Sequence, residues 1–417
     1  MKNIIAVIDR GLTRPSHSRW CLSLFGFGLL FALLFVFFVF PLMSDATSGM
    51  DPDGYGRTGQ NWYETGQFNS INKSPLYPLF IALISWLRGG YNLFAIQIGQ
   101  AILFALNNVV LYEVFRLTLN DRVGRYGSLL CAVFPLSILY IPRLWTETFL
   151  TFTLALFVWA LVLVLQRPTV LHSALCGVAL GVVILSKGIS VVFLPLTFVV
   201  FLIVLRRQNL IQSLSIVLAI ALLFLGSWTW RNWQVAGEFL PTHANGGYNF
   251  YLGNGFTKYW LDAPLSYPDL KDLTEVDIVA VYESAGFQPK NDLEVDDVLR
   301  EAALADLRER PLLGVQKLFV QSLTFWYLAG SSAKSLLTGG LQIPVLLLAL
   351  PGIWAVWRDK SWGLVLIIPI GGIMGLSVLV FAFGRLAITI MPYLIGLMTY
   401  ALLNGWGAPF FTPHEGS

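Results

Sequence analysis

The sequence predicts an all-α polytopic membrane protein, with about ten transmembrane helices, external juxtamembrane helices and a small external soluble insert. Two observations carry this prediction. Hydrophobic residues make up 56% of the 417 residues and charged residues only 12%, and the mean hydropathy is +0.68. Several apolar runs also approach or exceed the roughly 20 residues that a helix needs to cross a bilayer. The small net charge of +3 gives no indication of a nucleic-acid partner.

The first span is expected at residues 20–43. Four basic residues precede it: Lys2, Arg10, Arg14 and Arg19. This apolar run is too long for the hydrophobic region of a signal peptide, and no small-residue cleavage pattern follows it. We therefore expect a retained first helix with a cytoplasmic N-terminus, as the positive-inside rule predicts.

The other spans are expected where apolar runs lie between charged turns. They are 93–117, 126–140, 146–165, 172–185, 189–205, 210–230, 336–357, 362–383 and 386–406. On this count, six basic residues at turns fall on the cytoplasmic side: Arg116, Arg122, Arg125, Arg167, Arg206 and Arg207. This one-sided distribution is typical of cytoplasmic loops and supports the predicted topology.

Two apolar segments are harder to assign. Residues 75–87 are too few for a full span and indicate a juxtamembrane or partly inserted helix. Residues 312–328 could form a surface helix or a further span. Placing Arg358 and Lys360 on the cytoplasmic side requires this segment to stay at the outer surface.

The composition divides the chain into three parts. Residues 1–230 are expected to form an N-terminal transmembrane module whose first external loop, 44–92, is catalytic. Residues 231–334 hold most of the acidic residues and predict an external soluble and juxtamembrane segment. Residues 335–417 predict C-terminal transmembrane helices and a short cytoplasmic tail.

The cysteines and histidines show no metal-binding pattern. Cys21, Cys131 and Cys176 lie in or beside apolar runs without paired spacing, which is typical of small buried hydrophobic residues. The four histidines are scattered: His17, His172, His243 and His414. We therefore expect neither a disulfide framework nor a zinc cluster built from histidines.

Two carboxylates follow the first span, in the sequence Asp51-Pro52-Asp53-Gly54-Tyr55. One interpretation is a solvated turn, because Pro and Gly beside Asp favour turns. The other is an active site in which one carboxylate takes a proton from an attacking hydroxyl. The second carboxylate would then position the acceptor or a divalent ion held between Asp51 and Asp53.

Glu147 lies at the expected outer end of a span, at the same depth as the first external loop. An acid at a helix N-terminus is electrostatically favourable, and Thr146 could cap the helix. The alternative interpretation is a second acidic group of the active site, or a group that binds the acceptor.

Lys187 and Arg385 are the matching cations at outer helix ends. Gly188 and Gly384 flank them and would let a large anion approach the backbone. Lysine at an interface often extends its ammonium toward water, and this alternative stays open for Lys187. Arg385 interrupts an apolar stretch, and its planar guanidinium suits a phosphate.

The second external segment opens with Arg231 and Asn232. Asn-Gly steps follow at 245–249 and 253–255, and such steps normally indicate turns. Behind an arginine at the membrane boundary, they could also shape a pocket for sugar or phosphate oxygens.

Together these motifs resemble the GT-C superfamily of polyprenyl-phosphate-dependent glycosyltransferases, nearest to the prokaryotic protein-mannosyltransferase-like and aminoarabinose-transferase-like enzymes. The resemblance covers most of the chain. The further motifs that carry it are Gly66-Gln67-Phe68, Ser74-Pro75-Leu76-Tyr77-Pro78-Leu79, Leu185-Ser186-Lys187, Gly384-Arg385 and Met391-Pro392. Ala387 stands where the family often has a second basic residue, and Lys187 where it more often has arginine.

The resemblance implies a GT-C-type helix bundle and an inverting single displacement. Asp53 would be the base, with Asp51 as the competing candidate. The substrate-binding residues would be Tyr55, Glu147, Lys187, Arg231, Asn232 and Arg385. The implied donor is a polyprenyl-phosphate-linked sugar, and the leaving phosphate needs no obligatory metal, because cations can stabilise it.

The expected acceptor is a protein, a lipid or a glycan, and membrane lipids are the other expected partners. The expected location is a prokaryotic plasma membrane, with the active site facing outside or the periplasm. Two alternatives belong to other classes. One is a lipid or solute transporter, which would carry charges at mid-depth of its spans. The other is a non-catalytic component of a surface-polysaccharide pathway.

Overall fold

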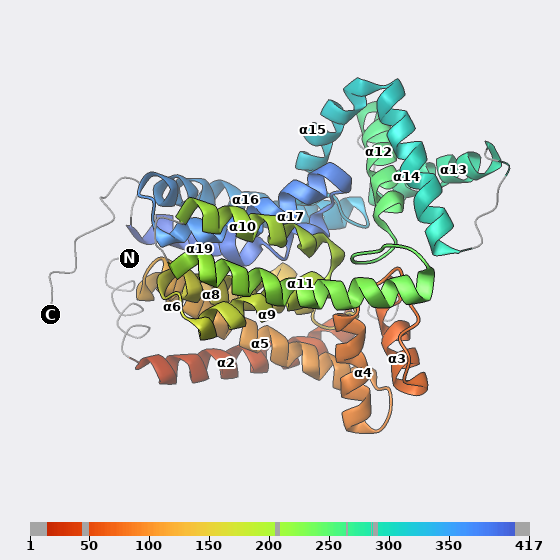
Figure 1. Ribbon diagram of the computed structural model, residues 1–417. Helices are drawn as coiled ribbons and strands as arrows, with labels where there is room; N and C mark the ends of the chain where they lie inside the picture. The colour runs from red at the N-terminus through yellow and green to blue at the C-terminus, as the bar shows by residue number, and fades with distance from the viewer. Residues whose placement is uncertain are drawn as a thin grey trace.

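The computed structural model describes residues 15–43, 50–204, 209–263, 266–284, 286 and 291–404. Every regular element in these ranges is helical. The long helices α2, α5, α8, α9, α11 and α16 run roughly side by side, and a second group of helices lies beyond one end of this bundle (Figure 1). The predicted all-α class is therefore confirmed.

The bundle combines long helices with short broken ones. In chain order its elements are α2 (His17–Leu34) with η1 (Phe35–Val39) and η2 (Phe40–Leu42), α5 (Leu93–Thr118), α6 (Asp121–Val133), α7 (Pro135–Leu139), α8 (Glu147–Gln166), α9 (Val170–Ser186), η3 (Gly188–Val192), α10 (Phe193–Val204), α11 (Asn209–Ala236), α16 (Ser332–Arg358), η4 (Trp362–Leu366), α17 (Ile367–Val380), α18 (Gly384–Ala387) and α19 (Met391–Asn404).

Six segments of the described chain are long and apolar enough to cross a membrane. They are His17–Leu42, Leu93–Thr118, Glu147–Gln166, Ile211–Ala236, Ser332–Arg358 and Trp362–Val380. Three shorter apolar helices lie at Leu76–Arg88, Val170–Ser186 and Gly188–Ile203. The count of about ten spans stays a prediction, since several predicted spans are built from two short helices.

The predicted span at 126–140 shows why helices break. Its helix begins earlier, at Asp121, and ends at Val133, and α7 begins separately at Pro135. Proline lacks the N–H that would continue the helix and pushes the preceding residue into the extended region. Phe134 accordingly has a ψ of 116°.

Small residues let α9 pack closely on α11. A Cβ on Gly177 would lie 2.8 Å from Cβ of Ile220, and one on Gly181 would lie 2.5 Å from Cγ of Phe224. Two small residues four positions apart lie on one helix face and allow two backbones to approach, which is the usual way in which helices associate within a bilayer.

Exposed tryptophans lie at the two ends of the bundle. Trp230 and Trp233, near the end of α11, are 60% and 55% exposed, and Trp354 and Trp357, near the end of α16, are 58% and 71% exposed. Tryptophan is enriched where a membrane meets water on either side. The positions therefore fit a chain whose bundle spans the bilayer.

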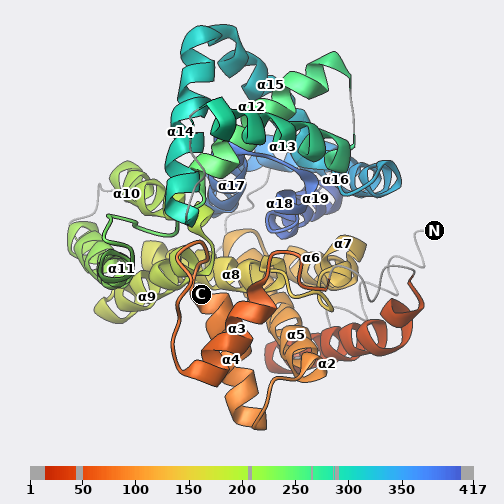
Figure 2. The same cartoon turned by 90° about the vertical axis from the view of Figure 1, so that its right-hand side faces the viewer.

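Beyond one end of the bundle lies a second group of helices, here called the external helices (Figure 1). Four of them follow α11: α12 (Gly246–Asp262), α13 (Tyr267–Ser284), α14 (Asp292–Glu309) and α15 (Pro311–Tyr327). In Figure 2, which faces this end, they lie above α3 (Tyr55–Thr65) and α4 (Leu76–Arg88) of the first external loop. Helix α15 therefore lies with the external group, and it is not among the six candidate spans.

Candidate active site

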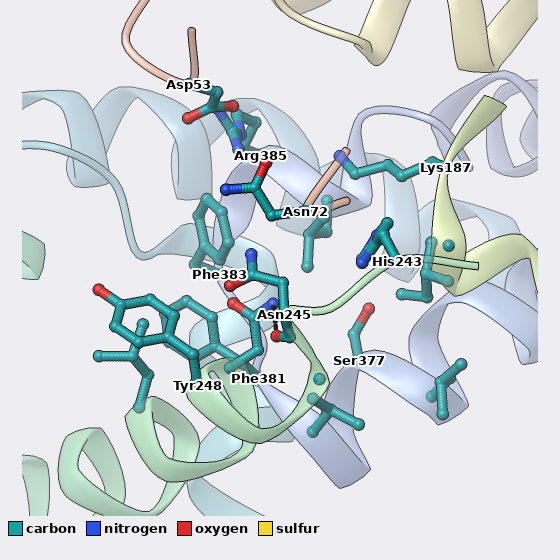
Figure 3. Close-up of a pocket in the computed structure, with 18 of the residues that line it drawn as sticks. Asp53, Asn72, Lys187, His243, Asn245, Tyr248, Ser377, Phe381, Phe383 and Arg385 are labelled. Carbon is teal, nitrogen blue, oxygen red and sulfur yellow. Dashed lines mark hydrogen bonds and ion pairs between the residues drawn. The ribbon is translucent and has the colours of Figure 1, made fainter. Parts of the chain in front are cut away.

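A cavity of about 530 Å³ opens where the external helices meet the bundle (Figure 3). Its walls come from the first external loop, the α9–η3 turn, the α11–α12 loop, α12, α13 and the α17–α18 junction. The polar and charged residues that line it are Asp53, Tyr55, Asn72, Lys73, Lys187, Thr242, His243, Asn245, Tyr248, Asn249, Tyr267, Lys271, Ser377 and Arg385. Cations outnumber carboxylates on these walls, so the cavity favours an anionic ligand.

The backbone around Arg385 is fixed by buried hydrogen bonds. The N–H of Gly384 donates to the carbonyl of Leu328 at 2.8 Å, and Nε2 of Gln342 donates to the carbonyl of Gly384 at 3.0 Å. A Cβ at Gly384 would lie 2.8 Å from Cγ2 of Thr338. Glycine at this position therefore lets α18 begin close to α16 and sets the direction of the Arg385 side chain.

The Arg385 guanidinium contacts two carboxylates that are far apart in the sequence. Its Nη1 lies 2.9 Å from Oδ2 of Asp53, and its Nε lies 3.3 Å from Oε1 of Glu147. The rings of Trp145 and Phe383 lie 4.8 Å and 5.2 Å from its central carbon. Aromatic faces attract a guanidinium and hold it in one plane.

Glu147 is buried behind these cations. Its side chain is 1% exposed, and Nζ of Lys187 donates to its Oε1 at 3.0 Å. Thr146 precedes α8, but its side chain makes no capping hydrogen bond. Capping by Thr146, one alternative left by the sequence, is therefore wrong. A buried carboxylate needs compensating charge, and Lys187 and Arg385 supply it.

Asp51 and Asp53 have different surroundings. Oδ1 of Asp51 accepts from the N–H of Gly56, and Oδ2 accepts from the N–H of Arg57, both at 2.9 Å. These bonds satisfy two free donors at the start of α3. Burial raises the pKa of Asp51, while the two N–H donors oppose that shift. The turn interpretation thus suits Asp51, whereas Asp53 lines the cavity.

Arg231 and Asn232 hold loops rather than line the cavity. Arg231 lies over the rings of Phe68 and Trp228 and donates to the carbonyls of Phe68 and Ser70. Nδ2 of the buried Asn232 donates to the carbonyls at Leu240 and Thr242, at 2.9 Å and 3.1 Å. Both residues therefore tie the end of α11 to segments that carry cavity residues.

The two Asn-Gly steps have different roles. Asn245 and Asn249 line the cavity at the start of α12. The predicted turn at 253–255 is wrong, because these residues lie inside α12. A Cβ on Gly253 would lie 2.0 Å from the carbonyl oxygen of Val380, so this glycine brings α12 against the end of α17.

The sequence analysis did not single out seven of the polar residues on the cavity wall: Asn72, Lys73, Thr242, His243, Tyr267, Lys271 and Ser377. Lys73 lies 5.8 Å from the ring centre of Tyr55, and a Cβ at Gly188 would lie 2.6 Å from Nε2 of His243. Figure 3 shows His243 beside Lys187, on the loop that leads into α12. Lys73 directly precedes the Ser74-Pro75 motif, and this position is the only feature of the sequence that could have indicated a place for Lys73 at the site.

Acid should destabilise the folded chain through His243. Burial, helped by nearby Lys187 and Lys73, lowers the pKa of His243 to about 4. Between pH 6.5 and 4 His243 binds a proton in the unfolded chain but not in the folded chain. The free energy of unfolding therefore falls as the pH drops over this range. At about 1.4 kcal/mol per pKa unit, the loss approaches about 3 kcal/mol at pH 4. Thermal unfolding in detergent at several pH values measures it.

The matched variant is His243→Asn, which removes this titration. It should show a shallower loss of stability between pH 6.5 and 4 than the wild-type chain. Equal slopes in the two proteins would show that other groups control the acid response.

Comparison with known proteins supports the predicted class. Residues 72–230 match the family model of dolichyl-phosphate-mannose-protein mannosyltransferase. This segment includes Lys73, Glu147 and Lys187. No curated protein matches the sequence significantly.

Solved structures of the Archaeoglobus fulgidus oligosaccharyltransferase show a similar fold. The archaeal oligosaccharyltransferase AglB from Archaeoglobus fulgidus, in complex with an inhibitory peptide and a dolichol-phosphate, superposes with a TM-score of 0.59 at 13% identity, over 92% of this chain and 50% of AglB. The Archaeoglobus fulgidus oligosaccharyltransferase complex with Zn and sulfate gives 0.57 at 13%, over 90% and 48%. ArnT from Cupriavidus metallidurans bound to undecaprenyl phosphate gives 0.42 at 17%, over 89% and 76%.

The chain thus spans about half the length of the oligosaccharyltransferase that it matches. Together, the family model and the shared fold confirm the predicted resemblance to the GT-C glycosyltransferases and agree with the predicted enzyme class, a glycosyltransferase.

Proposed function

We propose that this chain transfers a sugar from a polyprenyl-phosphate carrier to an acceptor at the extracytoplasmic face of a membrane, by an inverting single displacement. The observation that carries the proposal is the position of Arg385 on the cavity wall, between Asp53 and Glu147. A cation that bridges a partly exposed acid and a buried acid can exchange one of them for a phosphate.

The donor phosphate would replace Asp53 on Arg385. Asp53 is 34% exposed and can turn away, whereas Glu147 is 1% exposed and stays to hold the guanidinium. A guanidinium binds phosphate through two parallel N–H donors, so the exchange retains the charge pairing of Arg385. It also frees the Asp53 carboxylate beside the bound sugar.

The freed Asp53 would act as the general base. The acceptor hydroxyl transfers its proton to the Asp53 carboxylate as its oxygen bonds to the anomeric carbon. The bond from that carbon to the phosphate oxygen breaks on the opposite face, which inverts the configuration. Arg385, Lys187 and Lys73 stabilise the negative charge that grows on the leaving phosphate.

Different sides of the cavity would bind the donor and the acceptor. The bundle side presents Arg385 and Lys187, next to the bilayer that would hold the polyprenyl chain. The external side presents Tyr248, Tyr267 and Lys271 from α12 and α13, over the opening. We propose that this side, together with Tyr55, selects a protein, lipid or glycan acceptor.

The positions of the charged side chains favour a reaction at the membrane surface over transport across the membrane. The two cavity cations of the bundle, Lys187 and Arg385, lie at helix ends where the bundle meets the external helices (Figure 1). A transport pathway would instead place charges along the bundle axis. With the cytoplasmic turns assigned by their basic residues, this end faces outside or the periplasm of a prokaryotic plasma membrane.

The donor set at Asp51 and Asp53 does not suit a divalent cation. Both oxygens of Asp51 accept backbone N–H bonds, and Asp53 pairs with Arg385. A hard cation needs oxygen ligands that converge on one point. We therefore derive no step through a metal at these two residues.

Sugar transfer should survive metal removal. Purified enzyme treated with EDTA and then passed into chelator-free buffer should retain its rate, because Arg385, Lys187 and Lys73 supply the positive charge at the phosphate. Loss of transfer that Mg²⁺ or Mn²⁺ restores would contradict this expectation and return a metal to the mechanism.

The test of the proposed function is transfer from a panel of polyprenyl-phosphate sugars by the purified chain in lipid vesicles. Mass spectrometry would follow the released polyprenyl phosphate and the mass added to the acceptor. We expect one donor class to turn over and the product to have the inverted linkage. Retention of configuration, or accumulation of a sugar bound covalently to the protein, would overturn the single displacement.

A further inference from the structure

A second cluster of chemically active side chains lies at the other end of the bundle from the cavity. His17 and Cys21 lie near the start of α2, and Glu113 lies near the end of α5. This end carries the basic turn after α5, so the topology places it at the cytoplasmic face. Its properties are independent of the proposed sugar transfer.

The three donor atoms converge on one point. His17 and Cys21 are four residues apart, so they share one face of α2. That face packs against α5. The imidazole nitrogen, the thiol sulfur and a carboxylate oxygen all lie within 4.8 Å of one another. Nε2 of His17 and Oε1 of Glu113 are hydrogen-bonded.

Cys21 differs from the other two cysteines. Cys131 and Cys176 are buried in the main core of the bundle, 3% and 0% exposed. Cys21 is partly exposed at the helix end, next to a histidine and a carboxylate. Cytoplasmic thiols stay reduced, so its sulfur remains available as a ligand.

Neighbouring residues orient the ligands. Nε and Nη2 of Arg116 both donate to Oε2 of Glu113, at 3.1 Å and 2.6 Å, which leaves Oε1 directed at His17. The His17 ring lies 5.6 Å from the ring of Tyr112. Metal ligands are commonly held by such outer hydrogen bonds and contacts.

The set of donors selects the kind of ion. One imidazole, one thiol and one carboxylate suit Zn²⁺, which binds nitrogen, sulfur and oxygen in tetrahedral sites. A sulfur ligand disfavours Mg²⁺ and Ca²⁺, which prefer oxygen. Three protein ligands leave a fourth position for water.

We propose that His17, Cys21 and Glu113 form a zinc site that joins the start of α2 to the end of α5 at the cytoplasmic face. The scattered positions of cysteine and histidine in the sequence gave no sign of it, because one ligand comes from a helix some ninety residues away. Bound zinc would fix the first helix, which has few buried residues of its own, against the bundle.

Cobalt is the probe for this site. The full chain, purified without a polyhistidine tag and stripped with a chelator, would be titrated with Co²⁺ and then with Zn²⁺. We expect one Co²⁺ per chain, with the absorption of a thiolate–cobalt bond, and its displacement by Zn²⁺. Cys21→Ala should remove the thiolate absorption. His17→Ala should weaken binding at least about tenfold, since even outer partners of metal ligands change affinity by about 10–100-fold.

The matched controls are Cys176→Ala, which changes a buried thiol, and His172→Ala, which changes a partly buried histidine at the start of α9. Both should bind Co²⁺ like the wild type. Thermal unfolding of the metal-free proteins shows whether each variant is folded. The proposal is overturned if wild type and Cys21→Ala give the same cobalt spectrum, or if folded wild type binds no Co²⁺.

Discussion

Replacing Asp53 with asparagine should lower the rate of sugar transfer by about 10²–10⁴-fold, the range that general base catalysis typically contributes. The amide has nearly the shape of the carboxylate but cannot accept the acceptor's proton. Donor binding should persist, because in the proposed complex Arg385, Lys187 and Lys73, rather than Asp53, contact the phosphate. The measurements are the turnover rate at saturating donor and acceptor, and the affinity for polyprenyl phosphate.

Asp51→Asn is the matched control, because it removes a neighbouring carboxylate from the same loop. Asparagine can keep one of the two N–H bonds at the start of α3, but its NH₂ group cannot accept the other. We therefore expect the free energy of unfolding to fall by about 1–3 kcal/mol, while transfer by the folded protein stays within a few-fold of wild type. A severe loss in Asp51→Asn combined with an active Asp53→Asn would move the base to Asp51.

Replacing Arg385 with alanine should both abolish transfer and destabilise the fold. The phosphate loses its planar donor, and Glu147 keeps Lys187 as its remaining ion-pair partner in the described structure. Removing one member of a buried ion pair costs about 3–5 kcal/mol, and Lys187 should keep the loss near the lower end of this range. Thermal unfolding and a donor titration measure the two effects separately.

A double variant separates the structural role of Arg385 from its role at the phosphate. Arg385→Ala with Glu147→Gln removes the buried carboxylate but leaves Lys187 with only the glutamine oxygen as its acceptor, so part of the lost stability should return while transfer stays absent. Arg385→Lys should restore part of the stability but little transfer, because an ammonium lacks the two parallel donors. Normal transfer in a folded Arg385→Ala protein would contradict the proposed role.

The membrane class could be predicted because hydropathy depends on composition over a window of residues. The same pattern placed the ends of α5, α8 and α16 within a few residues of the structure. It failed at α6, which begins at Asp121 after the capping Asn120 and ends at Val133, before Pro135. A hydropathy pattern detects neither a capping side chain nor a proline, and these two residues set the ends of this helix.

The candidate site was harder to predict, because its residues meet only through the tertiary fold. Asp53 and Arg385 come from opposite ends of the chain and lie 2.9 Å apart. The two carboxylates precede the same helix, and only the resemblance to the GT-C enzymes favoured Asp53 over Asp51 as the base. Their difference comes from the turn, in which Gly54 has a φ of 70° and Asp51 faces the N–H groups of α3.

Arg231 and Asn232 show a further limit of sequence patterns. A basic and an amide residue at a membrane boundary suggested substrate contacts, but the fold uses both to hold loops. His243 was overlooked because an isolated histidine carries no spacing signal. His243 reaches the cavity because its loop packs against Gly188, and this contact forms only in the folded chain.

The pairing of Arg385 with Asp53 has a kinetic consequence. In the free chain Asp53, the proposed base, is paired with Arg385, so an acceptor that binds first would find no free carboxylate to take its proton. Donor binding must come before acceptor activation, which predicts an ordered sequence with the donor first. The spent carrier phosphate occupies the same guanidinium, so it should leave last and compete with fresh donor. Release of the carrier phosphate, rather than bond formation, would then limit the turnover rate.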